Sequence, residues 1–148
     1  MAYRFRLENL LRLRQRQTEV AEFELARLFS AYGAVKDIIE TLLIMKNGSG
    51  ARLSGRLAGG GMPAGEYGLE KDYIETLDME LDRNRQRLFK LEQDIERAKE
   101  ILAKRHQEKE LVDRLKQKDL DAYTLEEQRG EQKRADDLAS IKYVQDKI

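Results

Sequence analysis

The sequence contains no cysteine, no tryptophan, a single proline and a single histidine among its 148 residues. The absence of cysteine excludes disulfides, thiolate metal sites and a cysteine nucleophile. The histidine, His106, stands in a charged stretch, whereas a catalytic or metal-binding histidine needs converging partners. We therefore interpret His106 as a solvated surface residue. We expect a protein that is not an enzyme and that uses no metal or other cofactor.

Neither sign of charge is in excess, because 28 basic residues are matched by 28 acidic residues. A dedicated nucleic-acid-binding protein normally has a basic excess, so we expect no nucleic-acid partner. No apolar run approaches the roughly 18–20 residues that cross a bilayer, and the first residues lack the apolar core of a signal peptide. These features predict a cytoplasmic protein without direct membrane insertion.

Glycine is scarce outside one stretch, because residues 48–68 hold eight of the ten glycines and the only proline. Glycine and proline cost a helix about 1 and about 3 kcal/mol each. Their clustering predicts one break, a hinge over 46–68, between a helix at about 5–45 and a helix at about 69–147. We also expect Gly130 to interrupt the second helix, leaving a frayed helical segment after it.

Apolar residues recur at seven-residue spacing on both sides of this break. The positions that we assign to the first seam are Leu7, Arg14, Ala21, Leu28, Val35 and Leu42, with Leu10, Gln17, Glu24, Ala31, Ile38 and Met45. The positions that we assign to the second are Ile74, Leu81, Leu88, Ile95 and Leu102, with Leu77, Asn84, Leu91, Ala98 and Arg105. A displaced apolar stripe then follows through Leu111, Leu115, Ala122 and Leu125. The pattern predicts an all-α fold, a long antiparallel two-helix coiled-coil hairpin forming one unit over residues 1–148.

Lengths and composition agree with an extended fold. The charged fraction of 38% exceeds the ordinary level of about 25%. At about 1.5 Å per residue, the first arm would span roughly 60 Å and the second about 100 Å. The second arm is therefore expected to overshoot the first, with both termini at the end opposite the loop.

A basic cluster occupies the start of the chain. It consists of Arg4, Arg6, Arg12, Arg14 and Arg16. Only Glu8 offsets these charges within the first 18 residues. The cluster could dock into an acidic surface or ring, or it could be an ordinary solvated helix face.

Apolar residues beside the hinge form a second candidate surface. They are Ile38, Leu42, Met45, Tyr73, Leu77 and Leu81. All six could belong to the seam between the helices, or some could face outward and bind a partner. The apolar stripe of the first arm is wider than one facing helix needs, so both interpretations stay open.

Three stretches of the chain are distinctive together: residues 5–14 (FRLENLLRLR), residues 73–77 (YIETL), and the charged run over 115–125 that leads to residues 131–139 (EQKRADDLA). In their order and spacing they resemble the FliJ family of flagellar type III export proteins. The resemblance implies an antiparallel coiled coil similar in shape to the stalk subunit of rotary ATPases. It also implies a non-enzymatic role in bacterial flagellum biogenesis, and so in motility and chemotaxis.

The resemblance implies three protein partners. Members of the family bind in the hexameric flagellar export ATPase, bind the cytoplasmic domain of the membrane export gate protein, and escort substrate-specific export chaperones. The basic cluster would bind the ATPase ring. The residues matching the family's gate-binding surface are Ile38, Leu42, Met45, Tyr73, Leu77 and Asn84. The protein would then be cytoplasmic and peripherally associated with the inner face of the cell membrane at the export apparatus.

Two other interpretations remain from the sequence. The chain could be the equivalent stalk protein of a virulence type III secretion system, which residues alone separate poorly from a flagellar one. It could also be a structural scaffold that dimerises through the exposed apolar stripe. An extended monomeric hairpin would favour the stalk, and a parallel dimer would favour the scaffold.

Overall fold

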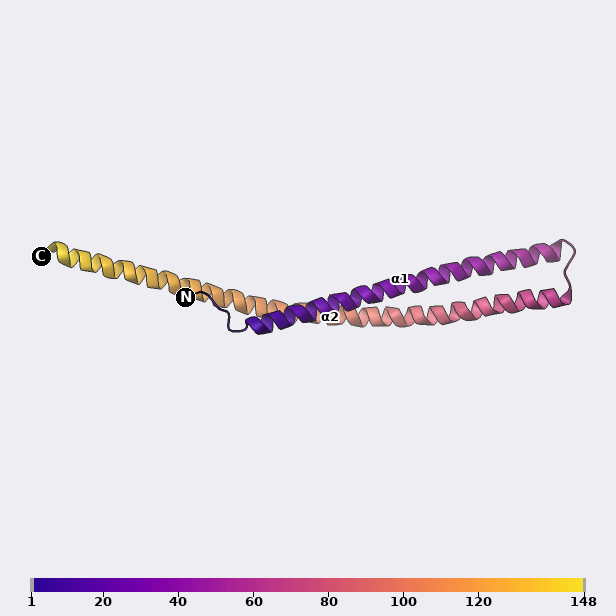
Figure 1. Ribbon diagram of the computed structural model, residues 1–148, viewed down its shortest axis with the longest axis horizontal. Coiled ribbons are helices and arrows are strands. Elements are labelled where there is room, and N and C mark those ends of the chain that lie inside the picture. Colours follow the sequence, from indigo (N-terminus) through magenta and orange to yellow (C-terminus); the bar gives the residue numbers. More distant parts are fainter. Residues whose placement is uncertain (1, 148) are drawn as a thin grey trace. The chain divides into compact units, whose positions relative to one another are not determined.

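The computed structural model describes residues 2–147 and consists of two helices joined by a short loop (Figure 1). Helix α1 spans Glu8–Ala58 and helix α2 spans Ala64–Lys147. Within residues 21–102 the two helices lie side by side and run in opposite directions (Figure 1). The predicted all-α hairpin is therefore confirmed.

The predicted hinge over 46–68 is too long, because both helices continue into it and the loop covers only residues 59–63. Packing explains the difference. Ser49 is fully buried, and Arg56 forms an ion pair with Glu66 at 2.7 Å across the end of the hairpin. The glycines that actually turn the chain are Gly60 and Gly61, whose φ angles of 129° and 85° are strained for any other residue.

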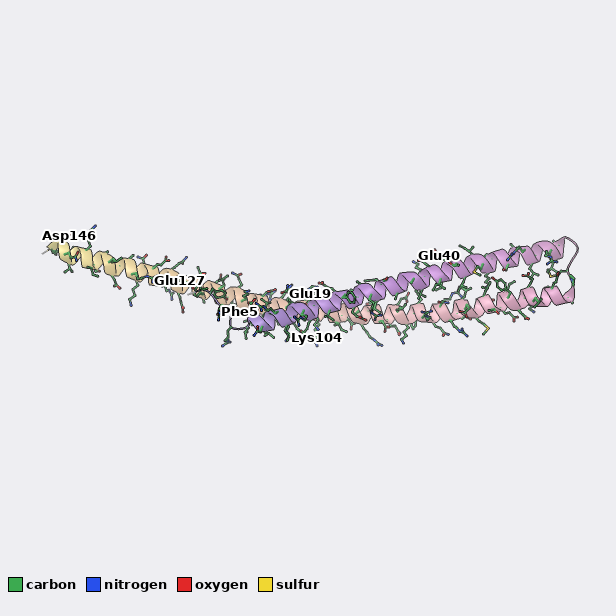
Figure 2. All side chains as sticks on the ribbon, in the orientation of Figure 1. Phe5, Glu19, Glu40, Lys104, Glu127 and Asp146 are labelled. Atoms are coloured by element: carbon green, nitrogen blue, oxygen red, sulfur yellow. The ribbon has the colours of Figure 1, made fainter. Side chains whose placement is uncertain are left out.

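The predicted interruption at Gly130 is also wrong, because α2 passes through it without a break. A lone glycine costs a helix only about 1 kcal/mol, and strong helix formers flank this one. Every residue from 131 to 147 is exposed, and Figure 2 shows the side chains of this part of α2 projecting outward around Asp146. No described part of α1 covers this end of α2.

Contacts divide the described chain into two units, residues 2–20 with 103–147 and residues 21–102. In the second unit, α2 buries Leu77, Leu81 and Asn84 as the heptads predict. Leu28, Ile95 and Ala98 form its core cluster. The prediction that residues 1–148 form one structural unit stays a prediction.

The seam of α1 differs from the predicted one toward the loop. Ala21, Leu28, Val35 and Ser49 are the buried residues of α1 in the second unit. The half-buried residues Leu25 and Tyr32 pack against the core cluster, and Ile39 and Leu42 are half-buried further toward the loop. The predicted residues Ile38 and Met45 are instead 43% and 41% exposed. At these two positions the next residue, Ile39 or Lys46, is half-buried instead. Glu24 and Ala31 are half-buried like their neighbours Leu25 and Tyr32, but the larger apolar neighbours are the ones that pack against the core cluster.

The predicted displaced stripe in the first unit is wrong as well. Leu111, Leu115 and Leu125 are 60%, 50% and 47% exposed, whereas Val112 is buried. The original heptad therefore continues through Val112. Lys116 is half-buried and reaches Glu8 at 3.1 Å, so its aliphatic stem occupies the seam while its ammonium group lies at the edge.

Candidate partner-binding surfaces

The basic cluster is held in place by contacts of the segment that precedes α1. The Tyr3 hydroxyl donates a hydrogen bond to Asp119 Oδ2 at 3.0 Å, and the Tyr3 ring lies 5.3 Å from that of Tyr123. Partial burial and the bond to Asp119 raise the pKa of Tyr3, so its hydroxyl keeps donating to a higher pH than that of a free tyrosine. The N-terminal segment is thus docked on α2.

Four of the five clustered arginines, Arg4, Arg6, Arg12 and Arg16, are exposed. The first three, together with Lys116, line a shallow groove of about 580 Å³ in the first unit. The surface therefore presents several guanidinium groups from one docked segment and one helix. Such a surface suits an acidic partner, because the cations are near one another and accessible.

Arg14 differs from the other four arginines. Its Nη1 donates to Glu108 Oε2 at 2.9 Å and to Gln17 Oε1 at 3.1 Å, and its side chain is only 30% exposed. Its Nε is buried and has no hydrogen-bond partner within the described residues. Arg14 therefore joins α1 to α2, and its predicted contact with a partner would compete with that role.

The predicted export-gate residues differ in how far they are exposed. Ile38, Met45 and Tyr73 are about two-fifths exposed, at 43%, 41% and 40%. Leu77 and Asn84 are 5% and 4% exposed, so they lie in the seam and cannot touch a partner while the helices stay packed. Leu42 is half-buried between these extremes. The assignment of these six residues to a partner stays a prediction, and only the first three are accessible.

Several apolar residues near the loop face solvent, although their positions in the sequence did not predict it. Ile44 and Leu69 are 73% and 72% exposed, and Met79 is 61% exposed. Exposed large apolar side chains at one end of a hairpin are candidates for a binding surface. These residues could have been recognised only with the correct register of α1. That register places Leu42 and Lys46 in the seam between the helices, and Ile44 outside it.

Other kinds of site have little support in the described residues. Residues 2–147 contain no group of three or more histidine, aspartate or glutamate side chains arranged to hold a metal ion. His106 is exposed on α2. Neither helix, over its described length, combines the length and the hydrophobicity that a bilayer span requires.

Comparisons with known proteins agree with this architecture. The chain is similar to a solved structure described as that of a YscO homologue, CT670, from Chlamydia trachomatis. The TM-score is 0.58 and the identity 18%, and the match covers 95% of this chain and 94% of the other. That likeness concerns the fold. No curated protein matches the sequence. The family described as "Flagellar FliJ protein" matches residues 3–147, nearly the whole chain, and the protein therefore belongs to the FliJ family.

Proposed function

We propose that the protein is a non-enzymatic stalk and escort protein of flagellar type III export. It binds in the hexameric export ATPase, binds the cytoplasmic domain of the membrane export gate, and escorts substrate-specific export chaperones. It works at the inner face of the cell membrane, attached through these partners. The observation that carries the proposal is a two-helix hairpin that matches the FliJ family over residues 3–147.

The exposed arginines are the ATPase-binding surface in this proposal. A stalk can bias a ring only by binding its conformers with different affinity. Arg4 and Arg6 of the docked segment, with Arg12 and Arg16 of α1, could do so if the subunit interfaces of the ring presented carboxylates to them at different spacings. The mechanism is steric and electrostatic, and the chain itself breaks no bond.

Replacing Arg4, Arg6, Arg12 and Arg16 together by glutamine should lower stimulation of the export ATPase at least about tenfold, as expected for four lost charge contacts. ATP hydrolysis by the assembled ring, titrated with each variant, measures this. Arg14 is left in place because its ion pair with Glu108 supports the fold.

A matched control replaces four exposed cations of the second unit, Lys36, Arg52, Lys71 and Arg85, by glutamine. It removes the same net charge and should leave the stimulation unchanged. Equal stimulation by the wild type and the arginine variant would refute the ATPase-binding assignment.

The accessible apolar residues near the loop are the export-gate surface. Ile38 and Met45 are seven residues apart and so share a face of α1. The Lys46–Asp78 ion pair places this part of α1 beside the segment of α2 that follows Tyr73. A partner could therefore cover residues of both helices at once.

Changing Ile38, Met45 and Tyr73 to serine should weaken binding of the purified export-gate domain at least about tenfold, because three exposed apolar side chains are lost from the contact. Isothermal titration calorimetry measures the affinity, and circular dichroism checks that helicity is kept. A control triple change of Val20, Phe23 and Phe89 to serine removes exposed apolar area elsewhere. If both variants bind as the wild type does, the gate surface lies elsewhere.

A further inference from the structure

The two sides of the hairpin within residues 21–102 are built differently. On one side, contacts cross from α1 to α2. Lys46 pairs with Asp78, the Tyr32 hydroxyl donates to Glu92 at 3.4 Å, and Lys99 Nζ lies 5.9 Å from the centre of the Phe29 ring. Asp78, Glu92 and Lys99 recur at multiples of seven residues and so share one face of α2. This side of the seam is closed by polar side chains.

The opposite side of the seam is an open groove. Two adjoining hollows of about 460 and 220 Å³ lie along it, and Asp94 borders both. Ala31, Ala34 and Ile38 of α1 form one wall, and Leu91, Ala98 and Ile101 of α2 lie on the other. Within residues 21–102, no ion pair or hydrogen bond between the helices covers this groove. Its floor is therefore apolar and accessible.

The rim of this groove carries an excess of positive charge. Arg27, Arg87, Lys90 and Arg97 border it, whereas Glu24 and Asp94 are its only carboxylates. Arg27 donates to Glu24 and also interacts electrostatically with Asp94, so this cation is already offset by the two carboxylates of the rim. Arg87, Lys90 and Arg97 are exposed and make no ion pair within residues 2–147. The rim, with four cations and two carboxylates, therefore keeps a positive excess beside the apolar floor.

We propose that this groove binds an amphipathic helix of a partner protein. The apolar side chains of that helix lie against Ala31, Ala34 and Leu91, and its acidic side chains face Arg87, Lys90 and Arg97. A helix laid in a groove is a common mode of protein recognition, and here the alanines let its backbone approach closely. This surface is distinct from the arginine cluster and extends past Ile38 away from the loop.

Charge favours a foreign acidic helix over a second copy of this chain. A two-fold symmetric dimer joined through this groove would bring the same rim of each copy together. Arg87, Lys90 and Arg97 would then face their own equivalents, and like charges across an interface are unfavourable. An acidic helix instead gains three charge pairs while covering the same apolar floor.

A pair of synthetic peptides tests the proposal on the full-length protein. Each peptide has four heptads with leucine at two positions in every seven, and the flanking positions are glutamate in one peptide and lysine in the other. Fluorescence anisotropy of the labelled peptides measures binding. The glutamate peptide should bind at least about tenfold more tightly than the lysine peptide, and its affinity should fall with salt, because screening weakens exposed charge pairs.

Two variants locate the binding in the groove. Ala34→Arg adds bulk and a further cation, so a loss of glutamate-peptide binding in this variant is steric and not caused by charge repulsion. Ala26→Arg, on an exposed position outside the groove, is its control. Changing Arg87, Lys90 and Arg97 to glutamine should also weaken binding, whereas the same change at Lys36, Lys71 and Arg85 should not. Circular dichroism confirms helicity in each case.

The peptide-binding measurements either support or overturn the assignment of this groove as a helix-binding site. Loss of binding in the two groove variants, with the controls intact, supports it. Equal binding of the two peptides, or full binding by Ala34→Arg, overturns it. A wild-type dimer in sedimentation equilibrium that Ala34→Arg converts to a monomer would also overturn it, because a second copy would then be the occupant. None of these measurements involves the export ATPase or gate, so the proposed function is tested separately.

Discussion

Replacing Leu81 by alanine is expected to lower the free energy of unfolding by about 3 kcal/mol. Leu81 is 1% exposed and is the largest fully buried side chain among the described residues. A two-helix interface has few neighbours that could move in to fill the space, so both the lost burial and the remaining cavity count against the folded state. Urea denaturation followed by circular dichroism measures the change.

Leu69 provides the control for this measurement. It lies on the same helix and is 72% exposed, so Leu69→Ala removes the same atoms without leaving a cavity. Its effect should stay within about 0.5 kcal/mol. Similar losses for the two variants would mean that Leu81 does not lie between the helices, and the heptad assignment of α2 would be wrong.

Replacing Gly48, Gly50, Gly55, Gly65 and Gly68 together by alanine is expected to stabilise the loop end of the hairpin by roughly 2.5–5 kcal/mol, at about 0.5–1 kcal/mol for each residue. All five lie inside helices, and a Cβ atom added to any of them would meet nothing within 4 Å. Alanine therefore reduces the conformational entropy of the unfolded chain and causes no steric clash in the folded one. Amide hydrogen exchange over residues 46–70 measures the free energy of local opening.

Gly61→Ala is the control of opposite sign. Gly61 has a φ of +85° in the loop, and a side chain there is strained by about 1–2 kcal/mol although space is available. This variant should exchange faster near the loop. Unchanged exchange in the five-alanine variant would mean that residues 46–68 form a flexible hinge in solution, as the glycine content alone predicts.

The sequence was sufficient for the two-helix fold because the signals for it are large and local. One cluster of glycine and proline marks one break, and the heptads of α2 from Ile74 to Ala98 are nearly uninterrupted. The helix ends were misjudged because helix propensity is small for each residue and packing overrides it. Ser49 is buried and Arg56 pairs with Glu66 within these glycine-containing turns, and neither feature can be read from the sequence of α1 alone.

The residues of each helix that face the partner helix were harder to predict, because apolar residues stand next to one another in the sequence. Ile38 and Ile39 are both isoleucine, and Leu111 lies next to Val112, so composition cannot tell which of each pair faces the partner. The structure buries Val112 and half-buries Ile39. A shift of one position turns a seam residue by about 100° around a helix, which is enough to expose it.

The same limit applies to the candidate surfaces. The arginines at the start of the chain look equivalent in sequence, yet Glu108, far along α2, pairs with Arg14 and leaves the other four exposed. Leu77 and Asn84 share a helical spacing with outward residues but lie in the seam. Which of these residues are exposed depends on contacts between distant parts of the chain, and the spacing of residues within one helix does not reveal those contacts.

The solitary course of α2 after residue 130 has a thermodynamic consequence. Because every residue from 131 to 147 is exposed, unwinding them from Lys147 inward breaks backbone hydrogen bonds and contacts between neighbouring turns, but no packing against another helix within the described chain. The number of ordered turns is then set by helix propensity, which weakens on warming. We therefore expect the helical content of residues 131–147 to fall on warming, and a partner that bound only the helical form of this segment would raise it again.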